Sequence, residues 1–310
     1  MRSVKQFWAL AKESAAAWVE DYAASMGAAL AYYSLFSIAP VLLIAITIAG
    51  FFFGEDAARG EILEQMRGMI GEEGGVALEG LLKSASEPAN SVIGMVTGVA
   101  LLILGATTAL TELQTALDRI WRAPAPQRQS GILKWFRSRL LSLGLIAAVG
   151  FLLMVSLVAS AALSALGKWW GSWFGEWKVV LEIVNQVVSF ALITGLFAVV
   201  YKLLPRVKIA WRDVWVGAAV TSVLFAIGKF LIGYYLGTSS IASGFGAAAS
   251  IVVLLVWVYY SAQIFLLGAE FTWVYAHRFG SLRSGGRPSA APKVPRRSHE
   301  PVAGIGLPLA

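Results

Sequence analysis

The chain has 310 residues, of which 58% are hydrophobic and 14% are charged, and its formal net charge is +7. Soluble domains carry about 25% charged residues and fewer apolar ones, so this composition excludes an ordinary soluble enzyme and a disordered chain. The chain has no cysteine, which excludes disulfides, thiolate metal sites and cysteine nucleophiles.

The first 28 residues predict a helix that lies on the membrane surface. Apolar side chains recur at helical spacing from Val4 to Tyr22, while Lys5 and Lys12 fall away from that stripe. We therefore expect residues 1–28 to form a cytoplasmic, interfacial amphipathic helix that leads into the first span.

Six apolar stretches are each long enough to cross a bilayer, which takes about 20 residues of helix. They cover residues 29–53, 92–110, 140–166, 179–201, 214–236 and 247–275. They predict an all-α integral membrane protein in which residues 29–278 form a bundle of six transmembrane helices. Residues 279–310 are rich in Gly, Pro, Ser and Arg, which is typical of a disordered tail.

The distribution of basic residues predicts the orientation of these spans. Of the 25 Lys and Arg residues, 19 lie in the N-terminal segment, in the second and fourth loops and in the tail, whereas five lie in the other loops. The positive-inside rule then places both termini in the cytoplasm. Because topology explains the basic charge, and no nucleic-acid-binding motif is present, we expect no nucleic-acid partner.

Two connecting segments have helical patterns of their own. The acidic loop over 54–91 predicts a short amphipathic helix broken at Gly71, Gly74 and Gly75, followed by a second helix over 76–83. A solvated charged face is the favoured interpretation of this loop, and a cation-attracting vestibule is the alternative. The loop over 111–139 predicts an elbow whose arginines contact lipid head groups or a partner. These arginines are Arg119, Arg122, Arg137 and Arg139.

Polar side chains inside the spans are the candidates for a substrate path. An ionisable group in the bilayer costs about 2.5–3.5 kcal/mol on insertion scales, so it usually faces protein or water. The candidates are Tyr33, Ser37, Pro40, Ser222, Lys229, Tyr259, Gln263 and Glu270.

Each group of candidates has a functional and a structural interpretation. Pro40 either breaks the first span to expose the hydroxyls of Tyr33 and Ser37, or it makes a plain kink packed by neighbours. Lys229 shares a face with Ser222 and small residues, which predicts that it faces the interior and contacts an anionic group, unless it snorkels to the outer head groups.

The sixth span carries a polar stripe. Tyr259, Gln263 and Glu270 share one helical face, which predicts either the lining of a pathway or a structural hydrogen-bond network. The sequence has no nucleotide-binding loop, nucleophile elbow or metal-binding helix. We therefore expect a protein that is not an enzyme and needs no cofactor or metal.

Four stretches resemble one bacterial family. They are AALAYYSLFSIAP over 28–40, LQTALDRIW over 113–121, YKLLP with WRDVWVGA over 201–218, and VWVYYSAQIFLLGAEFTWVYA over 256–276. They resemble the YihY/BrkB family of bacterial inner-membrane proteins, formerly described as ribonuclease BN, and the likeness covers roughly residues 5–278. The resemblance implies six spans in the inner membrane. The chain offers no plausible nuclease site, so we reject the ribonuclease interpretation.

Two functions of different classes fit these patterns. The first is a transporter or binder of a lipid-like or other amphiphilic envelope molecule, with membrane lipids as partners. The second is a non-transporting scaffold that binds a second copy or an envelope-assembly partner. A continuous polar cavity joining the first, fifth and sixth spans would favour transport, whereas lateral apolar grooves on a solid bundle would favour the scaffold.

Overall fold

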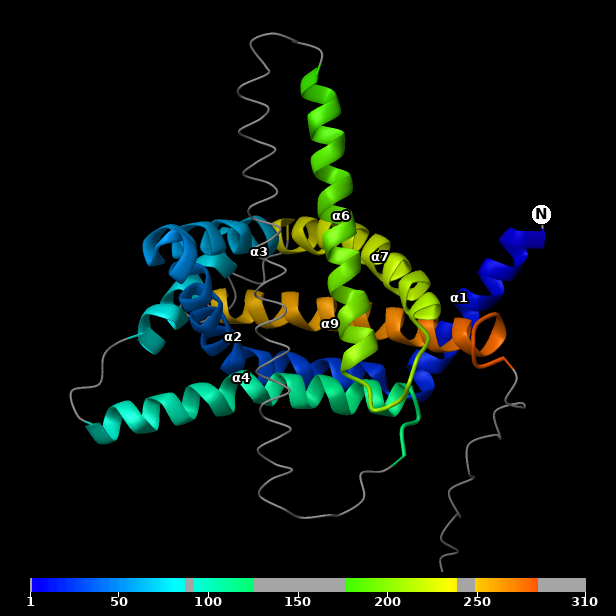
Figure 1. The fold of residues 1–310 in the computed structure, drawn as a ribbon, viewed down its shortest axis with the longest axis horizontal. Coiled ribbons are helices and arrows are strands. Elements are labelled where there is room, and N and C mark those ends of the chain that lie inside the picture. Colours follow the sequence, from blue (N-terminus) through cyan, green and yellow to red (C-terminus); the bar gives the residue numbers. More distant parts are fainter. Residues whose placement is uncertain (1, 87–91, 125–176, 239–248, 284–310) are drawn as a thin grey trace, which may run out of the picture.

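A computed structural model describes residues 2–86, 92–124, 177–238 and 249–283, and the regular secondary structure in these ranges is helical. The helices are α1 (Arg2–Glu20), α2 (Ala23–Phe53), α3 (Glu55–Ser86), α4 (Val92–Ile120), α6 (Trp177–Leu203), α7 (Trp211–Thr238) and α9 (Ala249–Arg278). Figure 1 shows α9 in the middle of this arrangement.

Four of the described helices contain segments long and apolar enough to cross a membrane. These segments are Ala23–Phe51, Gln186–Leu203, Trp211–Tyr235 and Ile251–Arg278. They confirm four of the predicted spans to within a few residues at most boundaries, and they make this a multi-pass membrane protein. The span predicted over 92–110 falls within α4, and the one predicted over 140–166 lies outside the described residues.

The helix α9 forms the centre of the packing, since α1, α2, α3, α4 and α7 all contact it. Its C-terminal half supplies fully buried side chains such as Leu266, Ala269 and Val274 to the main apolar core. A helix that is apolar on all sides is typical of the centre of a bundle, where every face meets another helix.

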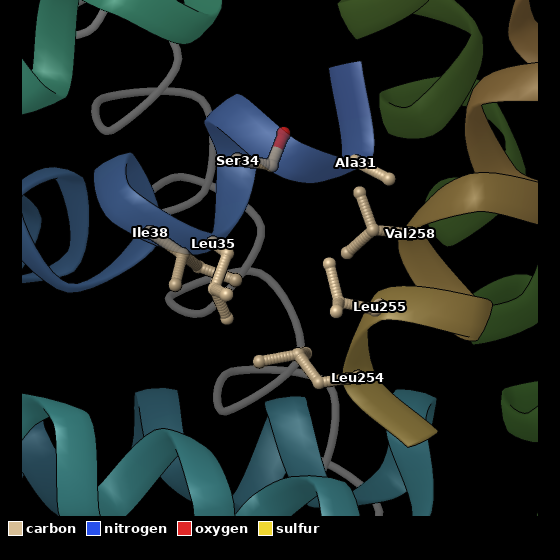
Figure 2. A pocket seen from close by; sticks show the side chains of 7 residues that line it. All are labelled: Ala31, Ser34, Leu35, Ile38, Leu254, Leu255 and Val258. Carbon is tan, nitrogen blue, oxygen red and sulfur yellow. The ribbon is translucent and has the colours of Figure 1, made fainter. Parts of the chain in front are cut away.

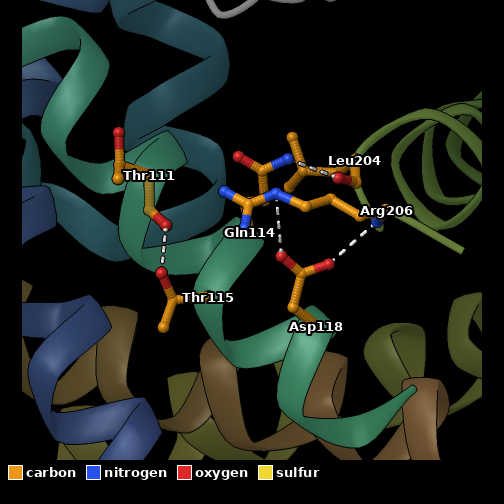
Figure 3. Close-up of polar contacts among 6 residues, drawn as sticks. All are labelled: Thr111, Gln114, Thr115, Asp118, Leu204 and Arg206. Carbon is orange, nitrogen blue, oxygen red and sulfur yellow. Dashed lines mark hydrogen bonds and ion pairs between the residues drawn. The ribbon is translucent and has the colours of Figure 1, made fainter. Parts of the chain in front are cut away.

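The ends of α1, α4, α6 and α9 and the starts of α2 and α7 meet at one end of the molecule, which we call the basic end. The Gln114 side chain of α4 donates to the Leu204 carbonyl at 2.9 Å, and Asp118 accepts the Arg206 backbone N–H at 2.8 Å and pairs with its guanidinium at 3.4 Å (Figure 3). These bonds fix the α6–α7 connection to the last turns of α4.

A second set of hydrogen bonds at the basic end holds the residues after α9. The buried Asp213 carboxylate in the first turn of α7 accepts hydrogen bonds from the backbone N–H and the hydroxyl of Ser281, at 2.9 and 2.7 Å. Leu282 packs against the main core. The tail predicted to start at 279 therefore has its first five residues folded against α7, and residues 284–310 lie outside the described ranges.

The helices α7 and α9 approach closely at two glycines. A Cβ atom on Gly217 would collide with the Thr272 side chain, and one on Gly268 would collide with Thr221 and would lie 2.7 Å from the Tyr201 hydroxyl. Small residues allow transmembrane helices to pack backbone against side chain. We call this contact the glycine crossing.

The helix α3 corrects the prediction for the acidic loop. One helical run covers Glu55–Ser86, where two separate helices were predicted. The Arg67 guanidinium nevertheless pairs with Glu79 at 2.6 Å, although twelve residues of straight helix would separate them by roughly 18 Å. The run therefore folds back on itself near the glycines, and Leu78 and Leu82 pack against α2.

Candidate functional site

A groove of about 420 Å³ lies between α7 and α9. The α7 residues that line it are Leu224, Ile227, Gly228, Leu231, Ile232 and Tyr235. The α9 residues that line it are Tyr260, Ile264 and Leu267. The lining is almost entirely apolar, and its volume lies within the range of about 300–1,000 Å³ that is usual for small-molecule sites.

The groove opens sideways from the membrane-spanning part of the bundle. Its α7 residues begin roughly 20 Å along the helix from Trp211 and end roughly 36 Å along it, so the groove lies in the half remote from the basic end. Several neighbouring α7 side chains, such as Phe230, are exposed.

Glycine 228 shapes the floor of this groove. A Cβ atom there would meet the end of the Ile264 side chain, whereas one on Gly233, a turn and a half farther along α7, would meet nothing within 4 Å. Since Ile264 is the neighbour that limits space at Gly228, a larger residue there must displace it or fill the groove. The two glycines therefore differ in position relative to the groove while sharing one helix.

Lys229 does not face the interior as predicted. Its side chain is exposed, although Ala218 and Ser222 on the same helical face are buried. The reason is that α6 covers this face only through its C-terminal half, while its N-terminal half projects away, so that Ile183 is 58% exposed (Figure 1). Lys229 also lies outside the residues that line the groove.

Ser222 lies in the contact between α6 and α7. Its hydroxyl lies 3.0 Å from that of Thr194 on α6 and also donates to the Ala218 carbonyl at 2.9 Å. Tyr259 is half-buried on α9 and stacks edge-on against Tyr260, which lines the groove. Of the candidates predicted from the sequence, Tyr259 lies beside the groove, and none lines it.

The candidates on α2 lie beside a crevice rather than a path. The helix continues through Pro40, which fits the kink rather than the break of the two alternatives, and the buried Ser37 hydroxyl donates weakly to the Ser34 carbonyl at 3.4 Å. Figure 2 shows the neighbouring crevice between α2 and α9, where Ser34 lies among aliphatic side chains. This crevice is too narrow to admit a water molecule.

Gln263 joins α9 to the start of α2. Its amide nitrogen donates to the Ala24 carbonyl at 3.3 Å, and a Cβ atom on Gly27 would collide with it. Its amide oxygen is buried and has no hydrogen-bond partner among the described residues. Gln263 thus sits in the α2–α9 interface, separate from the groove.

Glu270 is fully buried near the basic end of α9. Its side chain is 0% exposed, and neither carboxylate oxygen has a hydrogen-bond partner in the described part of the chain. Sequence reasoning placed Glu270 on a polar stripe, but the helical periodicity of α9 alone did not predict that neighbouring helices would enclose it completely.

The arginines of the predicted elbow stack on aromatic rings. Arg119 lies over the Tyr22 ring at 5.6 Å. Arg122, in the turn two residues after the end of α4, has a positive φ of 50° and lies over the Trp273 ring at 4.6 Å. Both arginines are exposed, so contact with lipid head groups remains a prediction. Arg137 and Arg139 lie outside the described ranges.

The groove was not predicted, because hydropathy treats its residues as ordinary span residues. The one available signal is Gly228, since a glycine inside a helix costs about 1 kcal/mol and often marks a close approach. Within the described ranges, His, Asp and Glu side chains do not gather in a set of three or more that could hold a metal ion.

Comparisons with known proteins identify the family. A family profile described as Virulence factor BrkB matches residues 15–293. This chain belongs to that family. The resemblance found in the sequence is confirmed. No solved structure matches the chain.

The relatives of this BrkB-family chain are named only as membrane proteins. A UPF0761 membrane protein of Tolumonas auensis is 26% identical over 244 residues, which are 78% of this chain and 77% of that protein. A UPF0761 membrane protein of Pseudomonas aeruginosa is 28% identical over 264 residues, and one of Alcanivorax borkumensis is 25% identical over 276 residues. The matched part spans 59% and 60% of these two longer relatives.

Proposed function

We propose that this protein is a non-enzymatic binder of lipid-like molecules and that the groove between α7 and α9 holds an acyl chain. The observation that carries the proposal is an apolar groove of about 420 Å³ that opens sideways on two membrane-spanning helices. An acyl chain suits this lining because it needs no hydrogen bonds from the walls. The Tyr235 and Tyr260 rings add amphipathic surface where a chain joins its polar head.

The arrangement of the other candidates favours binding at the groove over passage through a polar path. Ser222, Gln263 and Glu270 lie in three different helix interfaces. The α2 candidates lie beside a crevice too narrow for water. Movement of the bound lipid between leaflets would follow the outside of the bundle, with the head group in contact with polar side chains at either end.

Photo-crosslinking in proteoliposomes tests the proposal. A phospholipid with a photoactivatable group near the end of one acyl chain is incorporated, and crosslinked peptides are mapped by mass spectrometry. We expect crosslinks in 224–235 and 260–267, and we expect Gly228→Leu to reduce them several-fold by filling the groove. Gly233→Leu is the matched control, since that position is open and lies outside the groove lining.

The outcome that contradicts the proposal is equally specific. Crosslinks spread evenly over the exposed faces, and unchanged by Gly228→Leu in a folded protein, would show that the groove is ordinary lipid-facing surface. The scaffold function is the second candidate, and a lateral apolar groove meets the criterion stated for it from the sequence, because a partner helix also fits such a groove. Crosslinks from a photoreactive residue at position 231 to another protein chain, in place of lipid, would favour the scaffold.

A further inference from the structure

The connection between α6 and α7 carries a positively charged surface that the proposed lipid groove does not use. Its cationic side chains are Lys202, Arg206, Lys208 and Arg212. The two membrane-spanning segments that it joins end at Leu203 and begin at Trp211, so these cations lie at the boundary of the membrane-spanning part. The groove begins roughly 20 Å farther along α7, so the two surfaces are separate.

The acidic side chains bonded at this connection already have partners. Asp118 of α4 pairs with Arg206 at 3.4 Å. Asp213 is 2% exposed and accepts two hydrogen bonds from the segment after α9. Lys208 and Arg212 are exposed, and within the described ranges neither has an ion pair or a hydrogen bond. The connection therefore keeps uncompensated positive charge.

Lys202 adds a third cation to this surface. Its ammonium group donates to the Ile209 carbonyl and lies 5.5 Å from the centre of the Trp211 ring. An ammonium group has three N–H donors, so Lys202 keeps donors for a further acceptor. Lys208 directly precedes Ile209, so the bond to this carbonyl also brings the backbone of Lys208 close to the Lys202 ammonium group.

Exposed apolar side chains border these cations on the membrane side. Trp215 neighbours both Trp211 and Arg212, because residues three and four apart share a helix face. Trp211 and Trp215 are 47% and 49% exposed, and Leu203 at the end of α6 is 61% exposed. Tryptophan rings in this position are typical of the head-group level of a bilayer. The surface thus offers cations for a phosphate and apolar rings for the part of a lipid directly below it.

We infer that the α6–α7 connection binds an anionic phospholipid in the leaflet at the basic end. The lipid phosphate contacts Lys202, Lys208 and Arg212, and the upper part of the acyl chains packs on Trp211 and Trp215. We call these five residues the boundary site. A zwitterionic head group brings a cation of its own, which the uncompensated charges of the boundary site repel, whereas an anionic head group brings only negative charge.

Photo-crosslinking to lipids in vesicles of defined composition tests the boundary site. The full chain carries p-benzoylphenylalanine in place of Leu203, which leaves both tryptophans intact, and is reconstituted with equal amounts of phosphatidylglycerol and phosphatidylcholine. Mass spectrometry then identifies the lipids crosslinked to this position. We expect phosphatidylglycerol to exceed phosphatidylcholine by roughly fivefold or more, since one cation near an anionic head group already supplies about that factor.

Substitutions at exposed positions show whether the boundary site causes this preference. Arg212→Gln should lower the ratio, Lys208→Gln combined with Arg212→Gln should bring it close to that of the vesicles, and Arg212→Lys should retain most of it. Lys229→Gln is the matched control, because it removes an exposed cation from the same helix outside the boundary site, and it should leave the ratio unchanged.

Three results would overturn the inference. The first is equal crosslinking of the two lipids in the unsubstituted chain. The second is a preference that survives the double substitution, or that Lys229→Gln lowers as much as Arg212→Gln does. The third is loss of the lipid crosslinks when millimolar inorganic phosphate is added, which would show that the cations bind soluble phosphate rather than a lipid.

Discussion

The glycines of this chain differ in how much space a side chain would have at their positions. Gly268 is enclosed by Thr221 and by the Tyr201 hydroxyl, which donates to the Phe265 carbonyl at 2.7 Å. Gly195 on α6 has nothing within 4 Å of where a Cβ atom would be. Both are glycines inside apolar helices, and the sequence alone does not distinguish them.

We predict that Gly268→Val destabilises the protein by about 1–3 kcal/mol, because the added side chain forces α7 away from α9 and disturbs the Tyr201 hydrogen bond. Gly195→Val, made in open space, should be neutral or slightly stabilising. Reversible unfolding in mixed detergent micelles measures both. Equal effects of the two substitutions would show that the glycine crossing is not a tight contact in the membrane.

The burial of ionisable residues was predicted only in part from the sequence. Lys229 and Glu270 were both predicted to face the interior of the bundle, and the structure exposes Lys229 and buries Glu270. The helical periodicity of one span fixes which residues share a face, but it does not fix how far a neighbouring helix extends along that face. The divergence of α6 decides the environment of Lys229, and the docking of α1 decides that of Glu270.

Among the elements, α3 folds back on itself, and both buried apolar side chains and an ion pair stabilise that fold-back. Leu78 is 0% exposed in a cluster with Leu42 and Ile46 of α2 and Leu254 of α9. The Arg67–Glu79 pair is partly exposed, with 33% of the Arg67 and 55% of the Glu79 side chain accessible. Removing a buried leucine side chain costs about 2–5 kcal/mol, whereas an exposed ion pair contributes about 0.2–1 kcal/mol.

We therefore predict that Leu78→Ala accelerates hydrogen exchange of the backbone amides across α3 far more than Arg67→Ala does. Exchange measured by mass spectrometry in detergent or nanodiscs checks this, with α9 peptides as the internal reference. The reverse order would mean that the ion pair, rather than packing against α2, holds the fold-back.

Spans were easier to predict than the segments between them. A long apolar stretch is a local property, so the first, fourth, fifth and sixth spans appear close to their predicted positions. The start of α2, the continuity of α4 from its apolar run to Ile120 and the fold-back of α3 depend on contacts between distant segments. For example, α4 continues to Ile120 because Leu117 and Ile120 are buried by the basic end of the bundle, although the apolar run ends near residue 110.

At the level of the whole molecule, the clustering of helix ends at the basic end allows a direct test of orientation. The chain contains no cysteine, so a single introduced thiol gives an unambiguous label. We predict that the exposed Lys208, changed to cysteine, reacts with a membrane-impermeant maleimide only after the bacterial inner membrane is opened. The exposed Glu61 of α3, changed to cysteine, should react from the outer side of that membrane. The opposite pattern would reverse the proposed cytoplasmic position of the basic end.

We expect the glycine crossing to act as a pivot for the proposed lipid groove. It lies near Gly217 and Thr221, roughly 16 Å along α7 from Gly228, which lies in the floor of the groove. With a lever arm of this length, a tilt of α7 by about 5° about the crossing changes the separation of the groove walls by roughly 1 Å. We therefore expect the width of the proposed lipid groove to change with the tilt of α7, which follows the packing of its neighbouring helices and adjusts to the thickness of the bilayer.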